Sequence, residues 1–574
     1  MNNKKIIVLC ILLLPLSIFA QDKAIVLPSL ELESNVSKKV EDFLKEETKT
    51  EMTENVLHQV KKVTYDILGR ERLKKDTTAY LVKQRDKKMK VYISYLDFDT
   101  TGQNPIVGRF EINAQKGLKN IWLNNKKVSD KEFDELIKKM PVRKYKTPGY
   151  VEELTANQIK AILNGSKKVL ISEYKEPQNF MRYDSILTRS QITTHAFANN
   201  YFGTGIGVYF TETGCPHLAN VNTNYYIQGN TCAHGVKKHP TGVTRILQAT
   251  APQAKIYGYD QNNYPDPNSV NPKIEIGSHS WGICYDDEYC SEDMNMDNYI
   301  YNNRIINFVA AGNKNSTIPQ YWVTSPGKAL NAITVGAVTP YNNLYASYSM
   351  WKNSEIGNQK PELANYTDFY FPNDYIFTDN DGNTYTGYFA GTSASTPYSA
   401  GIAANLLQQY PFFKGHPELF KALLISGEKI TIGNASTFDM DNDSYVVRGV
   451  PVYSSLAWNH RFRLWNGNNS CCFDSQNKIT FTESDIAANK HYRIAIAWLT
   501  PGSYIYVNKN ISQDIELYVY QNGSLIASSL SSKNPFEVVD FITTSNNDLQ
   551  IVIKRFSNSG VGDVALGYSF WNDN

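Results

Sequence analysis

Short apolar runs that end in glycine or a small polar residue recur through residues 182–465 and constrain the fold more than any other feature. The clearest runs are 207–210, 254–258, 274–277, 305–311 and 332–336. Continuous apolar runs separated by helix-length segments are typical of strands buried on both faces of a parallel sheet. We therefore expect an α/β domain with helices on both faces, and functional residues beyond the carboxyl ends of its strands.

The first twenty residues have the three-part layout of a secretory signal peptide. Lys4 and Lys5 precede the apolar run 6–19, and Ala20 is a small residue at the expected cleavage point. The run is shorter than the roughly 20 residues that a transmembrane helix needs, and no later stretch comes close. We expect a secreted protein that loses residues 1–20 and has no membrane anchor.

Residues 21–177 differ in composition from the rest of the chain, because they are rich in lysine and glutamate and contain no cysteine. Segment 89–95 alternates like a strand, 154–163 has the apolar spacing of a helix, and 168–174 is typical of an edge strand. We interpret this part as a small α+β pro-segment. The alternative is a permanent N-terminal domain.

Residues 466–574 show alternating strands separated by turn signals, and the clearest is 514–520 followed by Asn522-Gly523, a strong hairpin signal. We expect an all-β sandwich here, after an α/β domain that spans 178–465. A chain of 574 residues is too long for one core, so several domains agree with its length.

Six cysteines remain once a signal peptide containing Cys10 is removed, namely Cys215, Cys232, Cys284, Cys290, Cys471 and Cys472. An even number in a secreted chain predicts disulfides. Proximity in sequence favours Cys215 with Cys232 and Cys284 with Cys290. The pairing of the last two stays open, because a disulfide between neighbours is strained.

Metal binding is the main alternative use of the polar residues. A set of possible zinc ligands lies close in sequence: Cys215, His217, Cys232, His234 and His239. Their spacing matches no compact zinc motif, and secreted cysteines usually pair with each other. The oxygen-rich segment 379–383 could bind calcium, but it lacks the terminal glutamate of the helix-loop-helix calcium motif, so a tight polar turn is favoured. We expect no required metal or cofactor.

The charge balance is close to neutral. Lysine and arginine number 58 and aspartate and glutamate 56, which leaves a formal net charge of +2. This composition offers no electrostatic reason to expect a nucleic-acid partner or an anionic membrane surface. Partners must be inferred from the site itself.

Segment 391–397, Gly-Thr-Ser-Ala-Ser-Thr-Pro, precedes the apolar helical run 400–407 and places Ser393 where a loop enters a helix. The N–H groups at a helix amino end favour developing negative charge, and proline in a first turn loses no needed hydrogen bond. A simple N-cap would explain an isolated motif of this kind. Three further motifs accompany it, at 205–214, 239–247 and 308–313.

These motifs supply an acid, a histidine, an asparagine and a serine in that order along the chain. The same order occurs in the subtilisin-like serine protease family, which this chain resembles over most of residues 185–410. Segment 360–364 resembles the stretch ahead of the family's nucleophile. The resemblance implies that Ser393 is the nucleophile, His239 the general base and Asn313 the oxyanion donor. It also implies that a strand formed by Ser280, Trp281 and Gly282 lines the substrate. The implied function is that of a secreted serine endopeptidase, made as a zymogen, that acts on protein or peptide substrates as a monomer.

The acid departs from the family pattern. Glu212 stands where the family has aspartate in Asp-Thr-Gly, and its longer side chain can still orient His239 if the two groups lie slightly farther apart. A catalytically inactive, secreted binding protein is the alternative that this departure raises. His234 is the other candidate for the general base, but the apolar helix aligns with the family pattern only if His239 is the histidine that begins it. Asn313 and this helix also argue against the acid-acting sedolisin relatives.

Acidic residues follow the strand that the resemblance assigns to substrate. Segment 285–288, Tyr-Asp-Asp-Glu, lies between Cys284 and Cys290. We hypothesise that it favours basic residues in the substrate.

Overall fold

In a computed structural model of the chain, the described residues are short segments between 88 and 179 and, with brief gaps, residues 192–572. The longest gap in the second part is 432–448. The expected signal peptide lies outside the described residues. The chain divides into two compact units, residues 1–93 with 151–173, and residues 94–150 with 174–574. None of the helices that the structure describes is long and apolar enough to cross a membrane.

The first unit contains a three-stranded sheet of order β5-β1-β6. Its strands are β1 Lys88–Tyr95, β5 Tyr150–Thr155 and β6 Val169–Glu173. Two of them coincide with the strands predicted at 89–95 and 168–174. The described positions of the predicted helix 154–163 are helical from residue 156 onward, so the helix begins slightly later than its apolar spacing indicated.

The second unit is built on an eight-stranded sheet of order β15-β14-β13-β11-β8-β10-β9, with β16 also paired to β14. Its strands are β8 Gly207–Glu212, β9 Tyr225–Ile227, β10 Lys255–Asp260, β11 Ile274–His279, β13 Ile306–Ala310, β14 Ile333–Thr339, β15 Leu344–Tyr345 and β16 Leu363–Tyr366. All the pairings are parallel except that of β15 with β14. The predicted parallel α/β sheet is therefore confirmed.

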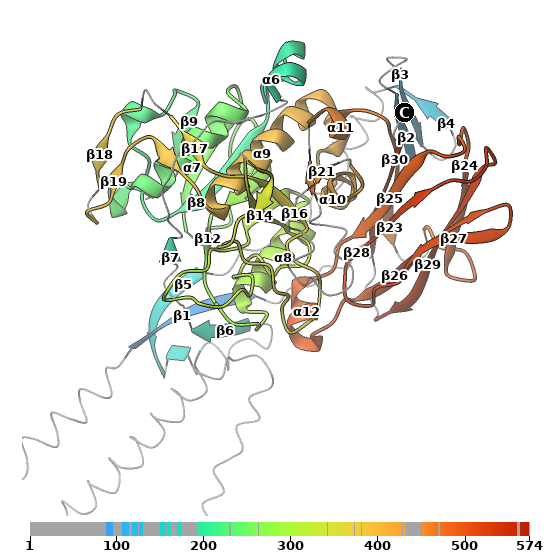
Figure 1. The fold of residues 1–574 in the computed structure, drawn as a ribbon. Helices are drawn as coiled ribbons and strands as arrows, with labels where there is room; N and C mark the ends of the chain where they lie inside the picture. The colour runs from blue at the N-terminus through green and yellow to red at the C-terminus, as the bar shows by residue number, and fades with distance from the viewer. Residues whose placement is uncertain are drawn as a thin grey trace, which may run out of the picture. The chain divides into compact units, whose positions relative to one another are not determined.

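Helices cover both faces of this sheet (Figure 1). They are α7 Lys238–Thr250, α8 Ser291–Asn303, α9 Thr392–Gln409 and α10 Pro417–Ser426. Successive side chains of β8 point to opposite faces. Val208 and Phe210 join the core beneath α7 and α9, whereas Tyr209 joins a separate core with Met296 and Ile300 of α8. This alternation explains why the strand is apolar at consecutive positions.

Two antiparallel sheets follow. Their orders are β28-β25-β30-β23-β2-β3-β4 and β24-β29-β26-β27. The C-terminal strands are β23 His460–Asn468, β24 Lys478–Glu483, β25 His491–Trp498, β26 Gln513–Gln521, β27 Ser524–Ser529, β28 Phe536–Ile542, β29 Leu549–Asn558 and β30 Asp563–Asn572. Phe481 of β24 packs on Trp465 of β23 and Tyr568 of β30, so the sheets face each other. The predicted Asn522-Gly523 turn joins β26 to β27, and both residues have positive φ.

Three strands from the N-terminal part of the chain lie in the larger of these sheets. They are β2 Ile106–Asn113, β3 Leu118–Leu123 and β4 Lys126–Val128. Figure 1 shows them in blue beside the orange-red C-terminal strands. The expected boundaries, 21–177 and 466–574, therefore do not follow the sheets, since periodicity predicts a strand but not its partner.

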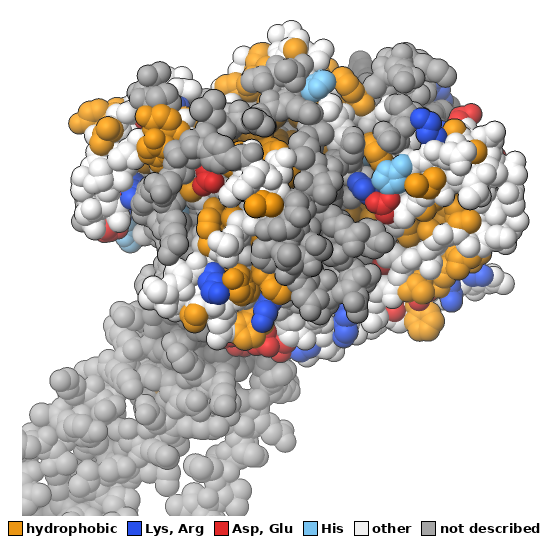
Figure 2. Space-filling model, viewed as in Figure 1, with side chains coloured by type: hydrophobic (Ala, Val, Ile, Leu, Met, Phe, Trp, Pro, Cys, Tyr) orange, Lys and Arg blue, Asp and Glu red, His pale blue; other side chains and the backbone are white. Residues whose placement is uncertain are grey.

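Shorter elements complete the described chain. They are α6 Ile192–His195, α11 Tyr453–Ala457, α12 Gly502–Asn508, and the strand pairs β7 Gln178–Asn179 with β12 Trp281–Gly282, β17 Phe369–Tyr370 with β20 Tyr388–Phe389, β18 Phe377–Thr378 with β19 Thr384–Tyr385, and β21 Lys429–Thr431 with β22 Gly449–Pro451. On the face drawn in Figure 2, the coloured basic and acidic side chains are scattered, in keeping with the small net charge.

Candidate active site

The predicted site residues gather at the carboxyl edge of the parallel sheet. Glu212 is the last residue of β8, Ser280 follows β11, and Asn313 lies just beyond β13. His239 and Ser393 stand in the first turns of α7 and α9. This edge is where open α/β sheets place their functional groups.

Glu212 and His239 form a buried hydrogen-bonded pair. The Nδ1 of His239 lies 2.8 Å from Oε2 of Glu212, and the two residues are 1% and 0% exposed. A carboxylate accepts the Nδ1 proton, so Nε2 is left with a lone pair that can accept another proton. Among the described residues, Nε2 has no hydrogen-bond partner. The longer glutamate side chain therefore reaches the histidine in this fold.

Ser393 is the second residue of α9, after Gly391, whose φ of +90° is unfavourable for other residues. Its Oγ donates to the carbonyl of Ser280 at 3.0 Å, and Oγ of Ser280 donates back to the carbonyl of Ser393 at 2.9 Å. The Ser393 hydroxyl is thus hydrogen-bonded to the Ser280 carbonyl. The hydroxyl must give up this hydrogen bond before Nε2 of His239 can take its proton.

Asn313 is held by its side-chain oxygen. Its Oδ1 accepts the backbone N–H of Thr392 at 3.0 Å and the Thr392 hydroxyl at 3.3 Å. Because an N–H donor requires an oxygen, this contact assigns the amide orientation and directs Nδ2 away from Thr392. A Cβ on Gly391 would lie 3.1 Å from Nδ2, so glycine keeps this space open.

The subtilase family profile matches residues 223–442. This segment belongs to the subtilase family. Serine protease AprX of Bacillus subtilis (strain 168) is 28% identical over 276 residues, which cover 39% of this chain and 61% of AprX. The alkaline proteinase of Hapsidospora chrysogena is 33% identical over 119 residues, covering 21% of this chain and 26% of that enzyme. The chain thus spans less than two thirds of either relative.

A crystal structure of a cold-adapted subtilisin-like serine proteinase aligns with 48% of this chain and 95% of its own, at 17% identity and a TM-score of 0.31. The subtilase match contains His239, Asn313 and Ser393, but it begins after Glu212. The acid is therefore the one member of the candidate site that the match does not cover.

The strand after Ser280 offers mainly backbone groups. Trp281 and Gly282 form β12, which pairs antiparallel with Gln178 and Asn179 of β7. The Trp281 side chain is fully buried, and its Nε1 donates to Oγ1 of Thr211 at 2.8 Å. Of the residues expected to line the substrate, Trp281 therefore contributes no exposed side chain.

A buried network that the sequence did not reveal supports the acid. Thr211, next to Glu212, accepts from the Trp281 indole, and its Oγ1 forms a second hydrogen bond with Nδ1 of His279 at 2.9 Å. Nε2 of His279 lies 3.0 Å from both Oδ1 of Asn307 and the Tyr209 hydroxyl. These bonds connect β8 to the strand that follows β11 and restrain the end of β8 that carries Glu212.

The burial of His279 predicts a pH dependence of stability. Burial lowers the pKa of His279 to about 4, against about 6.5 in an unfolded chain. Between these values the unfolded chain binds a proton that the folded chain does not. The free energy of unfolding should therefore fall by up to about 1.4 kcal/mol per pH unit as the pH drops through this window. Denaturant unfolding measured from pH 7 to pH 4 tests this.

His279→Gln should reduce this slope, because the variant has no titrating group at that position. Some slope should remain, since burial also lowers the pKa of His460, to about 3. The exposed His234 is the control, because His234→Gln keeps His279 and should retain the slope that His279 causes. An unchanged slope in His279→Gln would contradict the prediction.

The helix that carries His239 is capped at its amino end by a carboxylate from a hairpin that is distant in sequence. Helix α7 has no side-chain cap of its own, and Oδ2 of Asp379 accepts the backbone N–H of Lys238 at 3.2 Å. Oδ1 of Asp379 accepts the N–H groups of Asp381 and Asn383, which closes the turn between β18 and β19. These bonds favour the polar-turn interpretation of segment 379–383 over a calcium site.

Asp379→Ala should lower the free energy of unfolding by about 1 to 2 kcal/mol, the usual cost of removing a helix cap. Turnover should fall too, because the first turn of α7 positions His239. Asp381 of the same turn is the matched control: its side chain is 58% exposed and forms an ion pair with Lys237. Asp381→Ala should change stability by no more than about 0.5 kcal/mol. Equal losses in urea denaturation would contradict the capping role.

Phe389 packs against the candidate base. Its ring meets the ring of His239 edge to face, with centroids 5.2 Å apart. A Cβ on Gly242 would lie 2.2 Å from the Phe389 ring, so the absence of a side chain on α7 lets the aromatic ring approach. The glycine was visible in the sequence, but its partner was not.

All six cysteines considered are paired, as Cys215–Cys232, Cys284–Cys290 and Cys471–Cys472. The two pairings favoured by proximity are confirmed, and the neighbouring cysteines pair as well. The cysteines of the possible zinc site are therefore not thiolates, and its three histidines do not lie together. His217 stacks on Tyr375 and Phe377, His234 is exposed, and His239 bonds Glu212.

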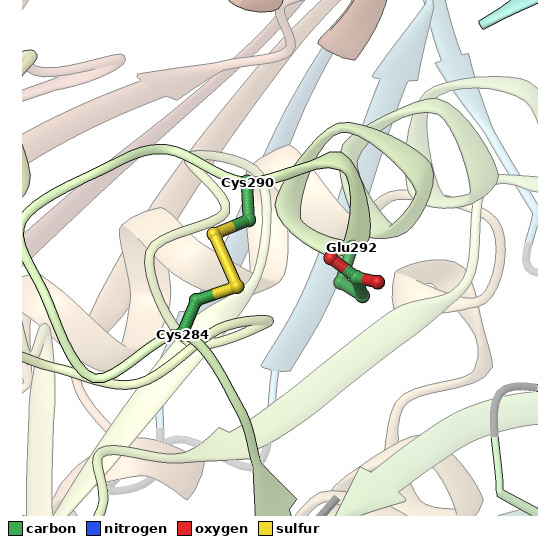
Figure 3. A group of neighbouring side chains, drawn as sticks. All are labelled: Cys284, Cys290 and Glu292. Atoms are coloured by element: carbon green, nitrogen blue, oxygen red, sulfur yellow. A yellow bond between two sulfur atoms is a disulfide. The ribbon is translucent and has the colours of Figure 1, made fainter. Parts of the chain in front are cut away.

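Two groups of metal-ligand types lie outside this site and share Cys290; the second consists of Asp286, Glu288 and Cys290. Cys284, Cys290 and Glu292 approach each other at the start of α8. Figure 3 shows the two sulfur atoms joined to each other, with Glu292 beside them on the helix. Disulfide sulfurs are not thiolates, so neither group keeps a cysteine ligand for a metal.

The loop enclosed by this disulfide is acidic. Asp286, Asp287 and Glu288 are exposed, and the Asp286 carboxylate lies 3.8 Å from Nζ of the buried Lys328. The lysine offsets part of the negative charge. A preference for basic substrate residues stays a prediction.

Proposed function

We propose that the chain is a secreted serine endopeptidase that hydrolyses peptide bonds through an acyl-enzyme. The observation that carries the proposal is the buried Glu212–His239 hydrogen bond of 2.8 Å, which leaves Nε2 able to accept a proton. The similar relatives are named as proteases. The inactive binding protein was motivated only by Glu212, and the contact with His239 weighs against it.

In the proposed reaction, Ser393 turns from the Ser280 carbonyl to His239. Its Oγ attacks the scissile carbonyl carbon while Nε2 of His239 takes the hydroxyl proton, and Glu212 stabilises the resulting imidazolium. The new oxyanion accepts hydrogen bonds from Nδ2 of Asn313 and from the N–H of Ser393 at the start of α9. The imidazolium then protonates the leaving amine, and water releases the acyl group by the same steps.

We also infer that residues 21–177 act as a pro-segment of this enzyme, with a cut near Pro177. The support is the antiparallel pairing of Gln178 and Asn179 with Trp281 and Gly282. An extended peptide binds a free strand edge through its backbone, so this pairing resembles the way a substrate or product would lie. The chain would thus occupy its own substrate strand until it is cut.

Labelling with a fluorophosphonate, which reacts with activated serines, tests the proposal. Intact mass is measured on the secreted protein before and after exposure to the probe. We expect a mature chain that begins near residue 178 and gains one probe mass. A protein that stays full length, takes up no probe and cleaves no peptide would overturn the enzymatic function in favour of a binding protein.

Asn313→Ala should lower kcat by about 100- to 1000-fold with little change in KM, because the lost amide stabilises the oxyanion and not the ground state. Steady-state kinetics on a peptide substrate measure both constants. The matched control is Asn263→Ala, since Asn263 is exposed. A rise in KM at constant kcat would instead assign Asn313 to substrate binding.

A further inference from the structure

Strand β23 is an interior strand of its sheet only because β2 lies beside it. On one side β23 pairs with β30 along its whole length, from His460↔Trp571 to Asn468↔Asp563. On the other side it pairs antiparallel with β2 over seven positions, from Ile106↔Asn466 to Ile112↔His460. Strand β3 then pairs with β2, and β4 with β3.

The register matches the apolar alternation of the two strands. Directly opposed residues of an antiparallel pair share a face of the sheet. Phe462 and Leu464 of β23 are fully buried, and Phe462 contacts the ring of Phe413 at 5.2 Å between centroids. The register places Phe110 opposite Phe462, and Ile112 opposite the buried His460. Strand β2 is thus paired in register beside the strand whose Phe462 packs on the subtilase segment.

Removal of β2 would leave a long edge. Seven positions of β23 would lose their strand partner, and the buried row that contains Phe462 and Leu464 would end at the border of the sheet. A long, flat, apolar edge strand readily pairs with another strand. Backbone pairing with an added strand is an established mode of protein association.

We propose that strands β2, β3 and β4 remain bound to β23 after the chain is cut, so that the mature enzyme is a two-chain assembly. The natural cut near residue 177 rests on the proposed function. The N-terminal segment is then not wholly discarded, because residues 106–128 serve as a docked subunit that completes the C-terminal sheet. The partner of the β23 edge is this segment of the same chain.

The test excises the strands without relying on the chain's own activity. Recognition sites for an unrelated, sequence-specific endopeptidase are inserted after residues 102 and 145 of the full Ser393→Ala chain. Complete cutting is verified on a denaturing gel, and the products are then analysed by size exclusion and native mass spectrometry. We expect segment 103–145 to stay bound and to separate only in denaturant. Its separation under native conditions would overturn the proposal.

Two variants of the excised segment identify the contact. Phe110→Asp puts a charge at the position that pairs with the buried Phe462, and the segment should dissociate at least about tenfold faster. Lys127 of β4 is exposed, so Lys127→Asp should leave dissociation unchanged. If both variants of the segment stayed bound equally well, the segment would not be bound through β23, and the proposal would also be overturned. A wild-type chain that never cuts itself would contradict the proposed function, but it would not change the binding measured for the excised segment.

Discussion

Ser393→Ala is expected to lower kcat/KM for peptide hydrolysis by about six orders of magnitude, the usual loss when the nucleophile of a Ser-His-acid triad is removed. Without Oγ no acyl-enzyme forms, and the residual rate comes from binding and the oxyanion donors alone. The variant should also remain uncut near residue 177. Steady-state kinetics and intact mass measure the two effects.

Ser395 provides a matched control two residues further along α9. It is fully buried, and its Oγ has no hydrogen-bond partner among the described residues. Ser395→Ala removes a hydroxyl of the same size from the same helix, so its kcat/KM should stay within a fewfold of wild type. Parallel losses in the two variants would mean that Ser393→Ala acts through packing and that the nucleophile lies elsewhere.

Glu212→Gln should lower kcat by about four orders of magnitude. Glutamine keeps the size of the side chain but cannot stabilise the imidazolium, and its amide group can hold His239 in the wrong tautomer. The measurement is kcat on a peptide substrate, with unfolding curves to show that the variant folds. Near-normal activity in this variant would contradict the role assigned to the acid.

Glu212→Asp provides the converse test, because it restores the family residue. The contact of 2.8 Å is made by the longer side chain, so aspartate should leave a gap of about one methylene. A displacement of about 1 Å can cost roughly 100-fold in rate, and we expect a loss of that order. A gain in activity would instead identify Glu212 as a lesion in a weakened enzyme.

Much of the candidate site could be predicted because its signals are local. Strands buried on both faces read as continuous apolar runs, and the carboxyl ends of such strands share one edge. Glu212, Asn313 and Ser280 therefore fall together at that edge. The choice of His239 over His234 also followed from a local pattern, the apolar helix after it.

The supporting contacts could not be predicted, since each joins segments that are distant in sequence. The sequence around Asp379 predicted a polar turn, but nothing in that turn indicates that one carboxylate oxygen of Asp379 caps the helix of His239. Thr211 and His279 are ordinary strand residues until their hydrogen bond connects two strand ends. The direction of the Ser393 hydroxyl likewise depends on Ser280.

The sequence by itself determined the parallel sheet, the order of the candidate site motifs and two of the disulfides, because burial periodicity, motif spacing and proximity are all readable along the chain. Only the tertiary structure decided that Glu212 reaches His239 and that residues 106–128 complete the sheet of residues 460–572. The reason is physical. A strand's pattern reports which face is buried but leaves its neighbour unspecified, and the reach of a side chain is decided by how far apart the fold holds two backbones.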